Sequence, residues 1–284
     1  MEIAAKLEAV PARDQSTRQD DSTAVVAPLP PIFAPSTALV FVVPAFNEEA
    51  NVPRLLADLE SRLDVLPDRS HLIVVDDGSE DATASIVESY GGPLSVQLVR
   101  LGANRGPGAA FRAGFDAALD GCSEDALIVT LEADTTSDLD ALAQMVAHAR
   151  EGAELVLASV HGGGQMVNVS VVRRILSRGA AWVMRRGLGV QAHTVSSFFR
   201  VYRASTLRAA IERYGETLIR ESGFACKAEL LAKLTAIGAR IEEVPVELDG
   251  SRRIGDSKMR VLPTLLGYWR LLFRARTGLE RVPA

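Results

Sequence analysis

The chain has 284 residues, 48% of them hydrophobic and 24% charged, which is typical of a soluble globular protein. Its net charge of -5 at pH 7 argues against nucleic acid as a general partner. Cys122 and Cys226 are too few for a disulfide framework and lack zinc-ligand spacing, so we expect reduced thiols in a cytoplasmic protein. No signal peptide is recognisable, and no apolar run reaches the ~20 residues of a membrane-spanning helix.

The first half of the chain alternates short apolar segments with helical patterns. Residues 1–36 mix charges with a proline-rich run and are predicted to be a disordered extension. Strands are then predicted at 38–43, 72–75, 96–101 and 126–129, with helices starting near residues 47, 81 and 107. This alternation predicts an α/β fold with a mainly parallel, doubly wound sheet and helices on both faces.

The second half continues the pattern less regularly. Glycines at 162–164 are expected to form a flexible link before an arginine-rich amphipathic helix at 169–186. A polar loop at 249–258 precedes a last helix at 263–276. Further strands are predicted at 155–158, 198–202 and 241–248, and further helices at 205–214 and 224–237.

Polar motifs follow three of the predicted strands at their carboxyl ends. They are Asn47-Glu48, Asp76-Asp77 and Glu132-Ala133-Asp134. Because ligands of parallel sheets bind outside the carboxyl ends of the strands, we expect these motifs to meet in one site. Asp76 or Asp77 would accept hydrogen bonds from the ribose or base of a nucleoside. Turn formation at Asp77-Gly78 is the alternative interpretation.

Two carboxylates two residues apart are candidate metal ligands. Glu132 and Asp134 follow a buried strand and can converge on one divalent cation, Mg²⁺ or Mn²⁺, which in turn can hold a diphosphate. The alternative is that these residues cap the helix that follows.

Basic residues gather in two segments. Residues 173–203 contain seven arginines and no acidic residue, and residues 252–281 contain eight basic residues against two acidic ones. Such segments suit phosphate groups or an anionic membrane surface, and a solvated basic face is the alternative.

The glycine pattern at residues 106–108 excludes two common nucleotide-binding classes. Gly106-Pro107-Gly108 follows the third predicted strand and has neither the full G-x-G-x-x-G nor a G-K-[ST] ending. A dinucleotide-dependent dehydrogenase or a P-loop enzyme is therefore not indicated. The glycines are also explained by a sharp turn into a closely packed helix.

Taken together, the motifs resemble the inverting family-2 glycosyltransferases, which have the GT-A fold. The second half resembles their polyprenyl-phosphate branch, typified by dolichol-phosphate mannose synthase. The resemblance implies one GT-A domain at 37–258, with a nucleotide-sugar half at 37–135, an acceptor half at 136–258, and an amphipathic helix in 259–284. The matching segments are VVPAFNEE at 42–49, VVDDGS at 74–79, NRGPG at 104–108, RILSRGA at 174–180, FRVY at 199–202, ELL at 229–231, EVPV at 243–246 and RRIG at 252–255 with Ser257 and Lys258.

The resemblance also implies roles for individual residues. Glu132, Ala133 and Asp134 fall on the family's metal motif, and Asp134 is the main expected ligand. Guanidinium and ammonium groups are suited to oxyanions. The donor implied by the resemblance is a GDP- or UDP-hexose, whose base and ribose would be held by Pro44, Phe46, Glu48 and Asp76. Gly106 and Gly108 would allow the chain to approach this donor closely. The diphosphate or the acceptor's phosphate would be contacted by Arg200, Arg252, Ser257 and Lys258.

The chain departs from the family pattern in two places. Glu132 replaces the first aspartate of the metal motif, and Thr194 and Phe198 replace an aspartate and a glycine of the acceptor segment. His193 beside this segment is a candidate general base toward a hydroxyl acceptor, with a structural role as the alternative. Glu229 is a candidate for binding sugar hydroxyls, or else a partner of an arginine on the helix surface.

Three functional hypotheses follow. The leading one is metal-dependent transfer of a hexose, of the mannose or glucose type, to a polyprenyl phosphate. The alternatives are transfer to a soluble hydroxyl compound such as a specialised metabolite, and non-catalytic binding of a nucleotide sugar. The last helix, with Trp269, Phe273 and three arginines, would make peripheral contact with the inner face of the membrane. Its alternatives are covering the core or forming a homodimer.

Overall fold

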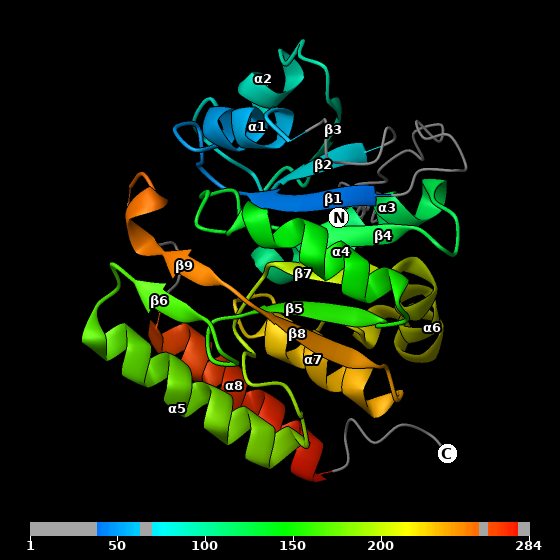
Figure 1. Ribbon diagram of the computed structural model, residues 1–284, viewed down its shortest axis with the longest axis vertical. Coiled ribbons are helices and arrows are strands. Elements are labelled where there is room, and N and C mark those ends of the chain that lie inside the picture. The colour runs from blue at the N-terminus through cyan, green and yellow to red at the C-terminus, as the bar shows by residue number, and fades with distance from the viewer. Residues whose placement is uncertain (1–38, 63–69, 256–260, 278–284) are drawn as a thin grey trace, which may run out of the picture. The chain divides into compact units, whose positions relative to one another are not determined.

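A seven-stranded sheet in the order β3-β2-β1-β4-β7-β5-β8 forms the centre of the fold (Figure 1). The structure is a computed structural model that describes residues 39–62, 70–255 and 261–277, all within the unit Phe33–Ala284. The strands are β1 (Leu39–Ala45), β2 (Ser70–Asp76), β3 (Ser95–Arg100), β4 (Leu127–Thr130), β5 (Leu155–Ser159), β7 (Arg200–Arg203) and β8 (Ile241–Pro245), and a two-stranded sheet pairs β6 (Gln165–Val167) with β9 (Glu247–Asp249).

The sheet is parallel except at one strand. β1 pairs in parallel with β2 and β4, β2 with β3, and β5 with β8. Only β7, among the described strands, runs antiparallel to its neighbours β4 and β5. The predicted mainly parallel α/β sheet is therefore confirmed. The carboxyl ends of the parallel strands and the beginning of β7 consequently share one edge.

Helices cover both faces because side chains alternate along each buried strand. Leu39, Phe41 and Val43 of β1 pack in the core with α1 and α4, whereas Val40 and Val42 pack in the core with α3, α6 and α7. The described helices are α1 (Val52–Glu60), α2 (Thr83–Glu88), α3 (Pro107–Gly121), α4 (Leu142–Arg150), α5 (Val171–Leu188), α6 (Ala204–Tyr214), α7 (Cys226–Ala236) and α8 (Val261–Thr277), with 3-10 turns at Leu139–Ala141, Gly215–Thr217 and Gly250–Arg252.

Two long helices, α5 and α8, pack against each other (Figure 1). We call them the α5–α8 pair. Met184 of α5 and Leu271 of α8 are fully buried in the same core cluster as α3 and α7. The outer side chains of the pair are exposed, as described below. No helix among the described residues has the length and apolar character needed to cross a bilayer.

Two predicted elements differ in the structure. The strand predicted at 241–248 is divided at Val246, whose N–H donates to the carbonyl of Ser159 and whose carbonyl accepts from the N–H of Gln165. The chain passes there from β8, which pairs with β5, to β9, which pairs with β6. Gly164, expected in a flexible link, lies against backbone at Ser159 and Val246, where a Cβ would come within 2.2 Å of both carbonyl oxygens. The extension predicted at 1–36 lies outside the described residues.

Candidate active site

A cavity of about 1010 Å³ lies at the carboxyl edge of the sheet. The motifs that follow β1, β2 and β4 contribute to its wall, as the sequence predicted from their positions at strand ends. Other parts of the wall come from the α5–α8 pair and from the start of α7. Its charged or polar lining includes Glu48, Asp77, Asn104, Glu132, Asp134, Thr136, Ser177, Thr194, Ser196, Ser197, Lys227, Arg253 and Thr264.

One guanidinium in the cavity wall contacts the carboxylate of Asp134 and is influenced by the charges of two further carboxylates. Asp134 is 5% exposed; its Oδ2 accepts from Arg253 Nε at 2.7 Å and also contacts Arg253 Nη2. Its Oδ1 accepts from the N–H and hydroxyl of Thr136 at 3.0 and 2.6 Å. Burial works to lower the pKa of Arg253, but Asp134, Glu132 and Glu48 together raise it. Arg253 is thus held as a cation among these acids.

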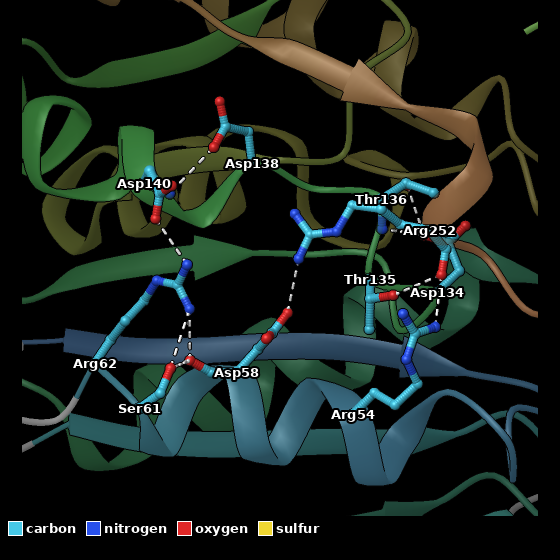
Figure 2. Close-up of polar contacts among 10 residues, drawn as sticks. All are labelled: Arg54, Asp58, Ser61, Arg62, Asp134, Thr135, Thr136, Asp138, Asp140 and Arg252. Atoms are coloured by element: carbon cyan, nitrogen blue, oxygen red, sulfur yellow. Dashed lines mark hydrogen bonds and ion pairs between the residues drawn. The ribbon is translucent and has the colours of Figure 1, made fainter. Parts of the chain in front are cut away.

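Arg252, which the resemblance assigned to phosphate binding, is directed elsewhere. Figure 2 shows its guanidinium turned to Asp58 on α1, at 3.0 Å. Its carbonyl accepts from Arg54 at 2.6 Å and from Thr135 at 3.2 Å, so its backbone joins α1 to the metal-motif loop. The side chain that lines the cavity is the neighbouring Arg253. Ser257 and Lys258 lie outside the described residues.

The two aspartates after β2 bond to the backbone of neighbouring loops. Asp76 Oδ1 accepts from the N–H of Ser79 at 3.0 Å. Asp77 accepts from the N–H groups of Arg105 and Gly106 at 2.7 and 2.8 Å, and burial raises its pKa against these hydrogen bonds. Asp77 therefore fixes the 104–106 loop while it lines the cavity. Pro44, Phe46 and Glu48 also line it, whereas Asp76 is buried beneath.

Gly106 and Gly108 make room for another segment of this chain. Gly106 has φ +86°, and a Cβ there would lie 2.5 Å from the carbonyl oxygen of Ser222. A Cβ at Gly108 would lie 2.1 Å from the Glu221 oxygen, and its N–H donates to Ser222 at 2.8 Å. The expected close approach is thus made to residues 221–222, although Gly106 also lines the cavity.

Arg200 differs most from its expected role. It is 1% exposed, and its guanidinium donates to the carbonyls of Ser197, Lys227 and Val195 at 2.9, 2.9 and 3.1 Å. A guanidinium bonded to three backbone oxygens is placed to organise the 195–199 segment and the start of α7. It does not contribute to the cavity wall, so direct contact with a phosphate is not supported by its position.

His193 lies outside the cavity wall. Its imidazole is 53% exposed, and both its Nδ1 and its N–H contact Glu243 Oε2, at 2.7 and 2.8 Å. Burial works to raise the pKa of Glu243, but its hydrogen bonds with His193, Ser159 and Thr194 lower it overall. This arrangement corresponds to the structural alternative for His193 and offers no contact with an acceptor in the cavity.

Glu229 is completely buried beside the 220–221 turn. Its Oε2 accepts from the N–H groups of Arg220 and Glu221, both at 2.8 Å, and its Oε1 pairs with Lys233 at 2.6 Å. Neither expectation for Glu229 matches this position, because the partner is a lysine one turn along α7 and the helix surface is buried. The i,i+4 spacing of Glu229 and Lys233 was the signal for this pair.

Sequence reasoning missed two basic residues of the cavity, Arg253 and Lys227. Lys227 is 6% exposed in the first turn of α7, and its Nζ lies 4.0 Å from the ring centroid of Phe198. A lysine within an otherwise apolar run, Phe224 to Leu231 apart from Glu229, was its available signal. Nothing in the sequence distinguishes Arg253 from Arg252 as the residue that lines the cavity, because the side chains of an irregular loop do not follow a regular pattern of directions.

The acidic residues fit a divalent cation that is shared with a substrate. Glu132 and Asp134 both line the cavity, and no cluster of three or more His, Cys, Asp or Glu side chains suited to a metal occurs among the described residues. Mg²⁺ in proteins is commonly bound by one or two carboxylates together with substrate phosphates and water. Two carboxylates beside a cavity therefore suit a cation that is completed by a diphosphate.

Comparison with known proteins identifies the family. The model of Glycosyl transferase family 2 matches residues 40–210, a range that runs from β1 to α6 and contains the carboxylates Glu48, Glu132 and Asp134 of the cavity. The chain belongs to this family. It is accordingly a glycosyltransferase, and this confirms the resemblance that its motifs carry.

Curated family-2 relatives extend the likeness across most of the chain. Polyprenol monophosphomannose synthase of Mycolicibacterium smegmatis is 28% identical over 251 residues, which is 87% of each chain. Undecaprenyl-phosphate mannosyltransferase of Micrococcus luteus is 30% identical over 220 residues, covering 77% of this chain and 86% of the relative.

Solved structures of glycosyltransferases share the fold. Glucosyl-3-phosphoglycerate synthase of Mycobacterium tuberculosis, in complex with Mn²⁺, UDP and phosphoglyceric acid, has a TM-score of 0.57 at 20% identity. The match covers 88% of this chain and 80% of that one. The same enzyme with Mg²⁺ and UDP gives a TM-score of 0.55. The expected GT-A fold is confirmed.

Proposed function

We propose that this glycosyltransferase moves a hexose from a nucleotide diphosphate sugar to a polyprenyl phosphate, with Mg²⁺ or Mn²⁺ as cofactor. One observation carries the proposal: a single cavity joins the carboxylates at the sheet edge to the α5–α8 pair, whose exposed side chains are apolar and basic. The two curated relatives described above act, by their names, on polyprenyl-type phosphates.

The donor belongs at the acidic end of the cavity. Phe46 and Pro44 supply apolar surface for a base, and Glu48 and Asp77 supply acceptors for hydroxyl or N–H groups. Glu132 and Asp134 would hold the cation, which when bound neutralises negative charge on the leaving diphosphate. Arg253 lies beside both carboxylates and would contact the same diphosphate through its guanidinium.

The acceptor belongs at the end formed by the α5–α8 pair. Large apolar side chains on the pair are exposed to solvent, and arginines such as Arg178, Arg185 and Arg270 are exposed on the same helices. Apolar and basic side chains on one pair of helices suit the surface of an anionic bilayer, where a lipid acceptor resides. The exposed apolar residues are Val171, Ile175, Trp182, Val183, Leu262, Leu265, Leu266, Trp269 and Phe273.

The position of His193 favours a phosphate acceptor over a hydroxyl acceptor. A hydroxyl needs a general base within hydrogen-bond reach, and His193 was the residue expected to supply it. In the structure His193 bonds to Glu243 outside the cavity wall. A phosphate acceptor is already ionised at neutral pH and needs no base, whereas a hydroxyl acceptor would need one of the carboxylates of the cavity in place of His193.

A panel assay tests this function. Purified protein is incubated with GDP- and UDP-hexoses, a short-chain polyprenyl phosphate and Mg²⁺ or Mn²⁺, and glycolipid formation is measured with and without chelator. We expect turnover with one donor that depends on the lipid phosphate and is lost with chelator. Turnover with the corresponding free polyprenol, or with soluble hydroxyl compounds instead, would contradict the proposed acceptor. Binding of a donor without any turnover would favour a non-catalytic protein.

A further inference from the structure

A lysine ammonium forms part of the cavity wall on α7, an element that carries none of the three carboxylates that act on Arg253. Lys227 Nζ lies 4.0 Å from the ring centroid of Phe198 and 5.4 Å from that of Phe224, and all three residues line the cavity. Its exposed fraction is only 6%. An ammonium in a cavity wall is suited to an anionic group of a ligand, because it can donate a charge-assisted hydrogen bond to that group.

The backbone that carries this lysine is held by a hydrogen bond from a buried arginine. Arg200, buried beneath, donates to the carbonyl of Lys227 at 2.9 Å and to that of Ser197 at 2.9 Å. The carbonyl of Phe198 accepts from the hydroxyl of Thr130 at 2.5 Å. Arg200 thus ties the segment that carries the ring to the helix that carries the lysine, and this gives the buried arginine a positioning role.

Hydroxyl groups line the same cavity as Lys227. Ser177 and Ser196 line the cavity with their Oγ atoms 3.4 Å apart, and Ser197 and Thr194 line it as well. Hydroxyls and an ammonium are suited donors to phosphate oxygens. The acidic side chains of Glu48, Glu132 and Asp134 gather instead around Arg253, where a second dianion would meet negative charge.

We propose that Lys227 is the cationic contact of the acceptor's phosphate monoester. The proposal rests on the proposed function and names the residue that binds the group about to attack. Phe198 supports the ammonium with its ring face, which explains the aromatic residue at a position where the family pattern has glycine. In this arrangement Arg200 does not contact the phosphate itself and acts by positioning Lys227 through the carbonyl of that residue.

Steady-state kinetics of Lys227→Gln and Lys227→Arg test the proposal. Lys227→Gln should raise KM for the polyprenyl phosphate tenfold or more and leave KM for the nucleotide sugar within twofold, because only the acceptor loses a charged contact. Lys227→Arg should retain acceptor KM within about threefold, since the charge is kept. The matched control is Arg213→Gln, which replaces an exposed basic residue of α6 and should behave as wild type.

Direct binding separates the phosphate from the lipid tail. Affinities for a short prenyl phosphate and for the matching prenol are measured by titration in the absence of donor. Wild type should prefer the phosphate at least tenfold, and Lys227→Gln should reduce this preference to threefold or less. An unchanged preference, or a donor KM that rises in place of the acceptor KM, overturns the proposal. Wild type that binds both prenyl ligands without transferring sugar would instead contradict the proposed function.

Two further measurements keep the result interpretable if Lys227→Gln folds poorly. Lys227→Met retains most of the aliphatic stem against Phe198 and should show the same loss of phosphate preference. In the wild-type protein, which has four lysines, ¹³Cε-labelled lysine reports binding without substitution. The signal of Lys227 is assigned by its absence from the spectrum of Lys227→Arg. It should shift when prenyl phosphate is added and should not shift when prenol is added. The absence of a shift with prenyl phosphate would overturn the proposal.

Discussion

Asp134 makes contacts on both of its carboxylate oxygens, and each has a different consequence. Thr136 holds Oδ1 and fixes the turn after β4, whereas Arg253 holds Oδ2 toward the cavity. A cation at this carboxylate would share Oδ2 with the guanidinium or replace it. Binding of metal and diphosphate should therefore alter the environment of Arg253 more than that of Thr136.

Asp134→Asn should remove most activity while leaving the fold intact. The amide keeps the volume and the contact with Thr136 but loses the charge needed for the cation. We expect kcat/KM to fall on the order of 10²–10³, the size typical of losing one electrostatic stabiliser of a transition state. Metal titrations of initial rate check this. Asp138→Asn, on the same segment but outside the cavity wall, should stay within threefold of wild type, and equal losses in both variants would contradict the assignment.

Arg200→Lys is expected to act on stability. Three hydrogen bonds from the guanidinium to carbonyls cannot be reproduced by one ammonium, and the buried carbonyls would lose partners. The free energy of unfolding should fall by ~2–4 kcal/mol. Urea unfolding measures this change, and calorimetry of nucleoside diphosphate binding to the folded variant provides the contrast. A normal stability with diphosphate affinity reduced tenfold would restore the direct role that the resemblance implied.

Side-chain direction within loops explains why several residue roles were not predictable. Arg252 and Arg253 have the same chemistry and are adjacent, and only contacts of the finished fold turn one to Asp58 and the other to Asp134. Similarly, the glycines at 106 and 108 were expected to let the chain approach the donor, whereas in the structure they make room for residues 221–222, which the sequence does not indicate. Motif positions were therefore predictable, whereas their partners required distant parts of the chain.

At the scale of elements, strand ends were the dependable prediction. β1, β2 and β4 are continuous apolar runs, so both their burial and the polar residues that follow them could be identified from the sequence. The parallel arrangement then brings those polar residues to one edge. The division of the predicted 241–248 strand depends on hydrogen bonds of Val246 with Ser159 and Gln165. The local sequence pattern does not predict this division.

The beginning of β2 predicts a pH effect on stability. Burial lowers the pKa of His71 from 6.5 to about 4, against a hydrogen bond with Gln97 that raises it. Between these pH values the unfolded chain binds a proton that the folded chain does not, so the free energy of unfolding should decrease as pH falls from 6.5 to 4. Urea unfolding at pH 7.5, 5.5 and 4.5 measures this. His71→Gln should lose part of the decrease, and an identical pH dependence would contradict the assignment.

At the scale of the whole molecule, the α5–α8 pair predicts binding to lipid surfaces. Trp182 and Trp269 are 67% and 64% exposed, and each is followed on its helix by exposed arginines. Trp182→Ala with Trp269→Ala should reduce binding to vesicles containing anionic lipid by tenfold or more, because aromatic rings favour the interface. Flotation with anionic and with purely zwitterionic vesicles measures the apolar and charge contributions separately. Unchanged flotation of the double variant would exclude this face as the contact.

The single antiparallel strand has a consequence for the order in which the chain assembles. β1 to β4 come from residues 39–130 and can pair among themselves as synthesis proceeds, but β5 cannot reach the sheet before β7 has been made, because β7 lies between β4 and β5. Until residue 203 is available, the outer edge of β4 presents unpaired backbone groups. Truncated chains ending between β5 and β7 should consequently aggregate, whereas chains that extend beyond residue 203 should become more soluble.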